Sequence, residues 1–230
     1  MTPIVLIPGL ACTAELFAPQ LPALWLQGPV TVASTLEGDA IAAIAAAILR
    51  DAPPRFALGG LSMGGYVALE IMRQAPERVA KLALLDTAAR ADTAEQSQQR
   101  RALVARAEAG DLEAVLRQIA PNLLHPDHRA DKRLIEAQVR MGLAIGAADF
   151  ARQQGAIMGR IDSRPHLAGI RVPTLVLVGD RDLLTPPDRS REMADAIPDA
   201  RLVVIPECGH ASTLEQPDAV NAALIEWLST

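Results

Sequence analysis

The chain has 230 residues, of which 50% are hydrophobic and 21% are charged, so it can bury the core of one globular domain. Its net charge is −5 and it has no polybasic run, which excludes the usual electrostatic pattern of a nucleic-acid-binding protein. Aromatic residues make up only 3% of the chain, too few for the stacking platforms that bind single strands.

Short apolar segments rich in β-branched residues alternate with longer helical patterns, which is typical of βαβ units. Continuous apolar runs suit strands that are buried on both faces, so the sequence predicts an α/β fold with six mostly parallel strands and helices on both faces. The expected strands are Ile4–Ile7, Val30–Ala33, Arg55–Gly59, Val79–Asp86, Thr174–Val178 and Leu202–Ile205. The expected helices of this core are Asp39–Arg50, Met63–Gln74, Pro186–Ile197 and Glu215–Leu228.

Between the fourth and fifth strands, residues 89–159 show only helical patterning. Breaks at Gly110-Asp111, around Pro121 to Pro126 and at Gly146 divide this segment into four expected helices. The segment is too long for a connecting loop, so it is predicted to be an inserted helical lid. The α/β core would then consist of residues 1–88 and 160–230.

The predicted lid is slightly richer in basic residues than the acidic remainder of the chain. Solvated faces of surface helices explain this difference adequately. A second hypothesis is that the lid attracts an anionic or carrier-protein-linked substrate through Arg100, Arg101 and Arg106.

The sequence predicts neither a membrane anchor nor an export signal. Its longest apolar run, Ala40–Leu49, has ten residues, whereas roughly 20 are needed to span a bilayer. No basic region or cleavage site follows Met1. The two cysteines, Cys12 and Cys208, are too few for a disulfide framework or a metal site, and both are expected to be small buried hydrophobic residues. A cytoplasmic location is therefore expected.

Gly60-Leu61-Ser62-Met63-Gly64 follows an expected strand and precedes an expected helix, as a nucleophile elbow requires. This turn is so tight that the residues two before and two after the serine must be small, and both are glycine here. Ser62 is therefore the candidate nucleophile. The alternative is a glycine-rich turn with an incidental serine.

A serine hydroxyl needs a base that accepts its proton. Of the four histidines, only His210 lies in a loop after a strand, at the edge where open α/β sheets place their sites. His125 and His128 fall in the predicted lid, and His166 falls between the lid and the next strand. His210 is therefore the candidate base.

The carboxylate that orients the base is expected between the serine and the histidine in chain order, in a loop after another strand. Asp182 satisfies this condition and lies before an expected helix. Asp86, at the end of the strand next to the elbow, is the alternative. Asp180 is expected to pair locally or to cap its turn.

The oxyanion of an acyl-transfer intermediate needs donors that are already in place. The backbone N–H of Met63 opens the helix after the nucleophile, where the helix dipole favours negative charge. The second donor is expected from the loop after the first strand, where Gly9 allows close approach, and Leu10 is the candidate.

In these motifs the chain resembles the α/β-hydrolase superfamily over nearly its whole length, starting at Ile4. The family's three motifs occur here in the same order. They are the nucleophile elbow at Gly60–Gly65, the acid loop at Val178–Asp182 and Thr185–Pro187, and the histidine loop at Cys208–His210. The likeness is greatest to small carboxylesterases of the pimeloyl-carrier-protein methyl ester esterase type.

The resemblance implies a sheet with the family strand order 4-3-5-6-7-8. Only three residues precede Ile4, so the family's N-terminal hairpin is expected to be missing. Pro8-Gly9 stands where the family usually has His-Gly, so the oxyanion loop around Leu10 is expected to have its own shape.

The expected activity is hydrolysis of a small or medium carboxylic ester through acyl-Ser62, with no metal or organic cofactor. The expected partner is a small-molecule ester, and neither nucleic acid nor membrane is expected. Enol-lactone hydrolysis, carbon–carbon bond hydrolysis, perhydrolysis and lyase chemistry use the same triad and stay open. So do a non-catalytic ligand-binding receptor and an inactive family member. The residues do not specify an oligomeric state.

Overall fold

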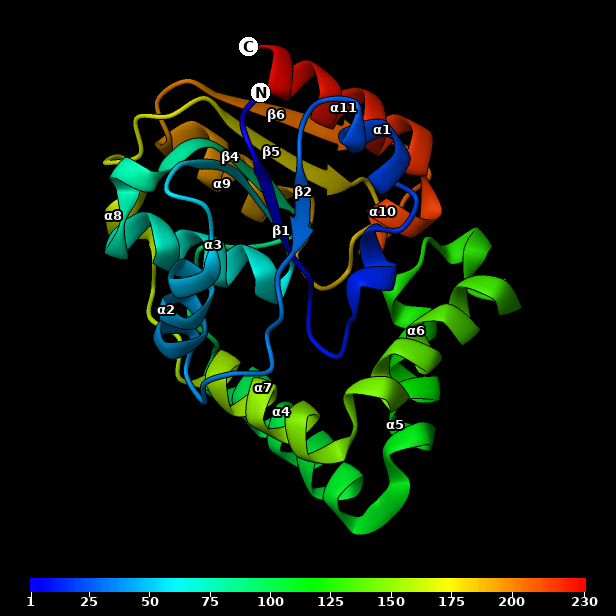
Figure 1. Cartoon of the computed structure of the whole chain (residues 1–230). Helices are drawn as coiled ribbons and strands as arrows, with labels where there is room; N and C mark the ends of the chain where they lie inside the picture. The colour runs from blue at the N-terminus through cyan, green and yellow to red at the C-terminus, as the bar shows by residue number, and fades with distance from the viewer.

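The computed structural model describes residues 1–230, and its centre is a single sheet whose six strands are all parallel to their neighbours (Figure 1). The spatial order is β2-β1-β3-β4-β5-β6, which is the expected family order when β1 is taken as the third family strand. The predicted six-stranded α/β-hydrolase sheet is confirmed. The strands are β1 (Ile4–Ile7), β2 (Val30–Val32), β3 (Phe56–Leu61), β4 (Val79–Leu85), β5 (Thr174–Gly179) and β6 (Ala200–Ile205).

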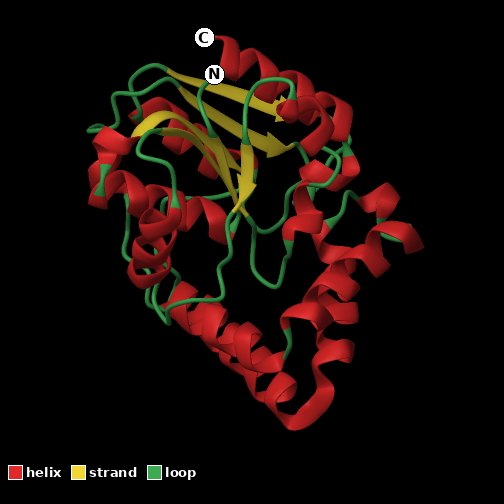
Figure 2. Ribbon diagram, viewed as in Figure 1, coloured by secondary structure: helices red, strands yellow, loops and turns green.

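Alternate residues of the strands face two separate hydrophobic clusters, because successive side chains of a strand point to opposite faces. Val5 and Ile7 pack on the face covered by α2, α3 and α9. Ile4 and Leu6 pack on the other face, against α1 and α11. Helices therefore cover both faces of the sheet, as Figure 2 shows.

The helices of the core lie close to the expected ranges. Among them, α3 begins directly after Ser62 and ends before Pro76, which cannot continue a helix. The helices outside the insertion are α1 (Leu21–Trp25), α2 (Ile41–Asp51), α3 (Met63–Gln74), α8 (Arg164–Leu167), α9 (Pro187–Ala196), α10 (Ser212–Glu215) and α11 (Pro217–Ser229). No helix of the chain is both long and apolar enough to cross a membrane.

Four further helices lie between β4 and β5 in the chain and project below the sheet as a V in Figure 1. They are α4 (Ala94–Arg106), α5 (Leu112–Ile119), α6 (Lys132–Ile145) and α7 (Ala147–Met158). We call them the inserted helices. Helix α4 packs on α7, and α5 packs on α6. Gly110 and Gly146 occupy positive φ at the turns between helices, a conformation that glycine adopts without strain.

Two features of the elements differ from the sequence expectation. The predicted helix Glu215–Leu228 is wrong at its start: α10 ends at Glu215, and α11 begins at Pro217, whose fixed φ suits a first helical position. The short helix α1 and the 3₁₀ turn at Ala14–Phe17 have no counterpart in the prediction. Each has only a few residues, too few for a helical period to show in the sequence.

Two glycines in the inserted helices predict opposite effects of the same substitution. A Cβ at Gly155 in α7 would meet no atom within 4 Å, whereas a Cβ at Gly142 in α6 would overlap the buried side chain of Leu116. Gly155→Ala should raise the free energy of unfolding by roughly 0.5–1 kcal/mol through helix propensity. Gly142→Ala should lower it by about 1–2 kcal/mol through overpacking. Urea unfolding of both variants measures the difference, and stabilisation of both would contradict the packing of α5 on α6.

Candidate active site

Ser62 lies in a strained turn between β3 and α3, with φ 56° and ψ −115°. The turn is possible because its neighbours have no side chains: a Cβ at Gly60 would overlap the Gly64 backbone, and a Cβ at Gly64 would overlap the carbonyl oxygen of Ile7. The Ser62 amide donates to the Leu85 carbonyl (2.9 Å), and the Thr87 hydroxyl donates to the Ser62 carbonyl (2.8 Å). The two neighbouring strands β1 and β4 thus hold the turn in place.

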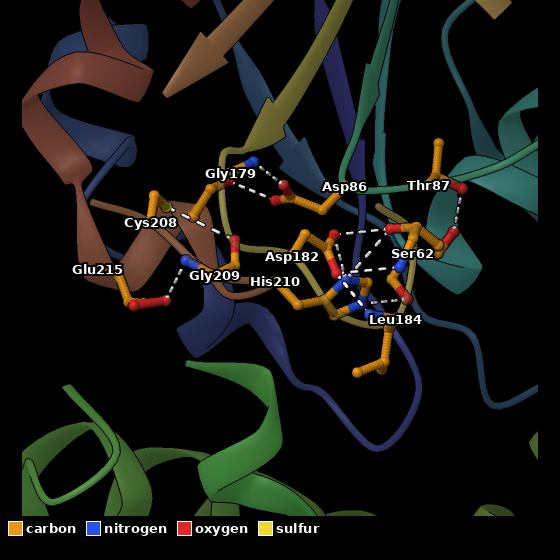
Figure 3. Close-up of polar contacts among 12 residues, drawn as sticks. Ser62, Asp86, Thr87, Gly179, Asp182, Leu184, Cys208, Gly209, His210 and Glu215 are labelled. Carbon is orange, nitrogen blue, oxygen red and sulfur yellow. Dashed lines mark hydrogen bonds and ion pairs between the residues drawn. The ribbon is translucent and has the colours of Figure 1, made fainter. Parts of the chain in front are cut away.

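The structure brings Ser62, His210 and Asp182 together, as Figure 3 shows. His210 Nε2 lies 2.8 Å from Ser62 Oγ, and His210 Nδ1 lies 2.8 Å from Asp182 Oδ2. With the proton on Nδ1, the imidazole donates to the carboxylate, and Nε2 can accept the serine proton. The arrangement supplies a nucleophile, a base and an orienting carboxylate at the carboxyl ends of β3, β5 and β6.

Asp182 is buried, and its carboxylate is satisfied by four donors. The amides of Leu184 and Thr185 donate to Oδ1 at 2.8 and 3.0 Å, and the Thr185 hydroxyl donates to Oδ2 at 2.7 Å. His210 is the fourth donor. The Thr185 hydroxyl has no counterpart among the predicted site residues, although Thr185 stands in the matched Thr185–Pro187 motif.

Electrostatics favour a charged pair between the histidine and the aspartate. Burial by itself lowers the pKa of His210, but the charge and hydrogen bond of Asp182 outweigh it and raise that pKa above its ordinary value. Burial by itself raises the pKa of Asp182, but His210 and the Thr185 donors outweigh it and lower that pKa. Each group therefore stabilises the ionised form of the other.

Asp86, the alternative acid, makes no hydrogen bond to the histidine. Its Oδ1 accepts from the Gly179 amide (3.0 Å), and its Oδ2 accepts from the Ser212 hydroxyl. Burial and the nearby negative charge of Asp182 raise the pKa of Asp86 to about 8. The structure thus pairs His210 with Asp182 and leaves Asp86 behind the pair.

The sequence led us to expect that Asp180 pairs locally or caps its turn, but its partner lies in another loop. It accepts from the Cys208 amide at 3.1 Å and so joins the loop after β5 to the loop after β6. Both cysteines are buried as predicted, and burial raises the pKa of both thiols, that of Cys12 to about 12. Neither thiol has the acidity of a nucleophilic cysteine.

The expected oxyanion donors, the amides of Met63 and Leu10, belong to two segments that lie next to Ser62. Met63 is the first residue of α3, so its amide is one of the unpaired donors of a helix start. The loop after β1 touches the elbow, because a Cβ at Gly9 would lie 3.4 Å from Ser62 Cβ. The next residue, Leu10, lines the cavity together with Ser62, and its amide has no acceptor in the structure. These two N–H groups are available to an oxyanion.

Glu215 and Leu123 hold the histidine loop, and sequence analysis missed both. The buried carboxylate of Glu215 accepts from the amides of Gly209 (2.9 Å) and His125 (2.8 Å), and it lies 3.0 Å from His128 Nδ1. The Leu123 carbonyl, which follows α5, accepts from the His210 amide at 2.8 Å and from the next amide at 3.0 Å. His125 and His128 thus lie at this junction and not at Ser62. His166 is exposed elsewhere.

Ser62 and His210 open onto a cavity of about 510 Å³ between the sheet edge and the inserted helices. Half of its 28 lining residues are hydrophobic, including Leu10, Leu103 and Ile157. This volume is in the range of pockets that hold small organic ligands. No group of three or more histidine, cysteine, aspartate or glutamate side chains is arranged to hold a metal ion.

The strand order, the elbow after β3 and a histidine–aspartate pair from later loops define a protein of the α/β-hydrolase class. The model of the alpha/beta hydrolase family matches residues 4–223, and the chain belongs to this family. It is therefore a hydrolase of the alpha/beta hydrolase family, as its motifs predict.

The names of individual relatives state different activities. The chain is 32% identical to BpoC, a candidate non-heme bromoperoxidase of Mycobacterium tuberculosis, over 74% of this chain and 67% of the relative. It is 29% identical to a pimeloyl-[acyl-carrier protein] methyl ester esterase of Nitrosomonas europaea, over 72% and 68%. The structure of a thermophilic esterase from Thermogutta terrifontis superposes with a TM-score of 0.89 at 30% identity, covering 100% of this chain and 90% of the esterase.

The raised pKa of His210 predicts the titration of its imidazole. Because the Asp182 charge stabilises the protonated form, the ring should lose its proton only above the ordinary midpoint of about 6.5, and Asp182→Asn should lower the midpoint. NMR titration of the ring, assigned with a His210→Gln variant, measures both midpoints. Asp86→Asn is the control and should lower the midpoint less. A larger decrease in Asp86→Asn would make Asp86 the dominant partner.

Proposed function

We propose that this protein hydrolyses a small or medium carboxylic ester through an acyl-Ser62 intermediate. The observation that carries the proposal is the continuous hydrogen-bond chain from Ser62 through His210 to Asp182, with 2.8 Å at each link. This chain of contacts opens onto a largely apolar cavity. The proposal also draws support from the esterase names of the Nitrosomonas relative and the Thermogutta structure.

In the first half-reaction, Ser62 Oγ attacks the ester carbonyl while His210 Nε2 takes the hydroxyl proton. Asp182 stabilises the imidazolium that forms, which agrees with the mutual pKa shifts of the pair. The amides of Met63 and Leu10 donate to the oxyanion. When the tetrahedral intermediate collapses, the imidazolium protonates the departing alcohol, and the acyl group stays on Ser62.

In the second half-reaction, water attacks the acyl-enzyme. His210 removes a proton from the water and returns it to Ser62 Oγ as the acid is released. No step draws on a group other than these side chains and amides. We further propose that the inserted helices act as the lid over the site, because α4 supplies Gln96, Gln99, Arg100 and Leu103 to the cavity wall.

The test is hydrolysis of p-nitrophenyl esters from acetate to decanoate. Wild-type protein should turn over repeatedly, and Ser62→Ala should lose activity by roughly a thousandfold or more. The Cys12 thiol, which also lines the cavity, cannot replace Ser62, because burial raises its pKa to about 12. Ser97→Ala on α4, outside the cavity lining, is the matched control and should behave as wild type. Binding of esters without turnover would favour the receptor alternative. Equal activity of wild type and Ser62→Ala would remove Ser62 from the mechanism.

A further inference from the structure

The cavity at Ser62 has a pronounced charge asymmetry. Four arginines line it, Arg90, Arg100, Arg160 and Arg189, and no aspartate or glutamate does. This is the opposite of the chain as a whole, whose net charge is −5. A cavity that is lined by arginines and by no carboxylate favours a negatively charged ligand.

Two of these arginines share one counter-charge. Arg100 Nε donates to Asp92 Oδ2 at 2.7 Å, and Arg160 Nη1 donates to Asp92 Oδ1 at 2.5 Å. The side chain of Asp92 is 1% exposed and that of Arg160 is 7% exposed. Two guanidinium charges against one carboxylate leave one positive charge uncompensated at a largely buried place, which is costly unless a ligand or solvent anion neutralises it. Arg90 differs, because it forms a two-point pair with Glu192.

One nitrogen of each guanidinium, Nη2, makes no hydrogen bond. Arg100 Nη1 donates to Gln154 Oε1 (2.8 Å), and Arg160 Nε and Nη1 donate to the carbonyls of Arg90 and Ile157. Neither Nη2 atom has an acceptor in the structure. The Arg160 guanidinium also stacks over the Tyr66 ring, 4.2 Å from its centre, which fixes its plane. The pair is therefore held by buried contacts and keeps unused donors on residues that line the cavity.

We infer that Arg100 and Arg160 form an anchor for a carboxylate of the substrate, so that the preferred esters are half-esters of dicarboxylic acids. This inference rests on the proposed function and names its substrate class. One carboxylate balances the one uncompensated charge, and its planar oxygens match guanidinium donors. Apolar residues of the same cavity, such as Leu103 and Ile157, suit a methylene chain. Arg100 and His210 line the same cavity, so the anchor and the base are close enough to act on one ligand.

The sequence suggested that three arginines of the lid attract an anionic substrate, and the structure retains one of them in that role. Of Arg100, Arg101 and Arg106, only Arg100 lines the cavity. Arg101 is exposed, and Arg106 pairs with Asp111 and Gln118. Within the cavity, the unbalanced charge is that of the Arg100–Arg160 pair, and there it favours a small anionic ester.

Binding to a Ser62→Ala protein tests the anchor without turnover. The probes are monomethyl adipate, which carries one carboxylate, and dimethyl adipate, which has the same chain and no charge. Calorimetry should show at least about tenfold tighter binding of the monoester, the size of one charge-assisted contact. Adding Arg100→Gln should remove this preference, and Arg100→Lys, which keeps the charge without the planar fork, should keep part of it. Adding Arg101→Gln, one residue along α4 and exposed, is the control and should keep all of it.

The outcomes separate the two proposals. Equal binding of the two adipates, or the same loss of preference in Arg101→Gln as in Arg100→Gln, would overturn the anchor. Preference for the monoester in binding, together with no Ser62-dependent turnover of any ester, would support the anchor and overturn the proposed ester hydrolysis. With active Ser62, the ratio of kcat/KM for monomethyl to dimethyl adipate should fall at least about tenfold in Arg100→Gln and should not change in Arg101→Gln.

Discussion

The contact of Gly64 with the carbonyl of Ile7 is the constraint on which the rest of the site depends. It lets α3 start directly against β1, so the chain reverses within one residue and Ser62 takes a φ of 56°. A non-glycine residue in such a conformation costs on the order of 1–3 kcal/mol, which the surrounding packing offsets. The contact exists only because β1 and β3 are neighbours, so the crossover order of the sheet is what places a strained serine at its edge.

The polar groups around this serine differ in their depth of burial and in the direction of their pKa shifts. His210 and Asp182 are buried together and each stabilises the charge of the other, whereas Asp86 lies further in, and its raised pKa favours the neutral form near pH 7. A second ionised carboxylate beside Asp182 would add repulsion inside the same apolar surroundings. The raised pKa of Asp86 limits that repulsion, and its two hydrogen bonds link it to Gly179 and Ser212. The surroundings thus shift the pKa values of the two aspartates in opposite directions.

Sequence alone predicted the parts that depend on local pattern. The strands follow from apolar runs, and Ser62, Asp182 and His210 follow from turn chemistry and chain order, since parallel strands bring their carboxyl ends to one edge. The sequence could not predict features that depend on contacts between segments distant in the chain. Whether Arg100 lies inside the cavity while Arg101 lies outside depends on how α4 packs on α7. Glu215 looked like the start of a helix, because nothing local reveals that its buried carboxylate accepts from the backbone of His125, 90 residues away in the sequence.

The bonds from Leu123 to the histidine loop have a consequence for how such proteins diversify. The Leu123 carbonyl accepts two successive amides at His210, and the Glu215 carboxylate binds the backbone on both sides of the same junction. The inserted helices are therefore not a separate module that recombination can exchange freely. A chimaera that takes these helices from another family member must also take a compatible histidine loop, or its base loses two of the hydrogen bonds that set its position. During evolution, changes in the inserted helices and changes in the loop after β6 should accordingly occur together.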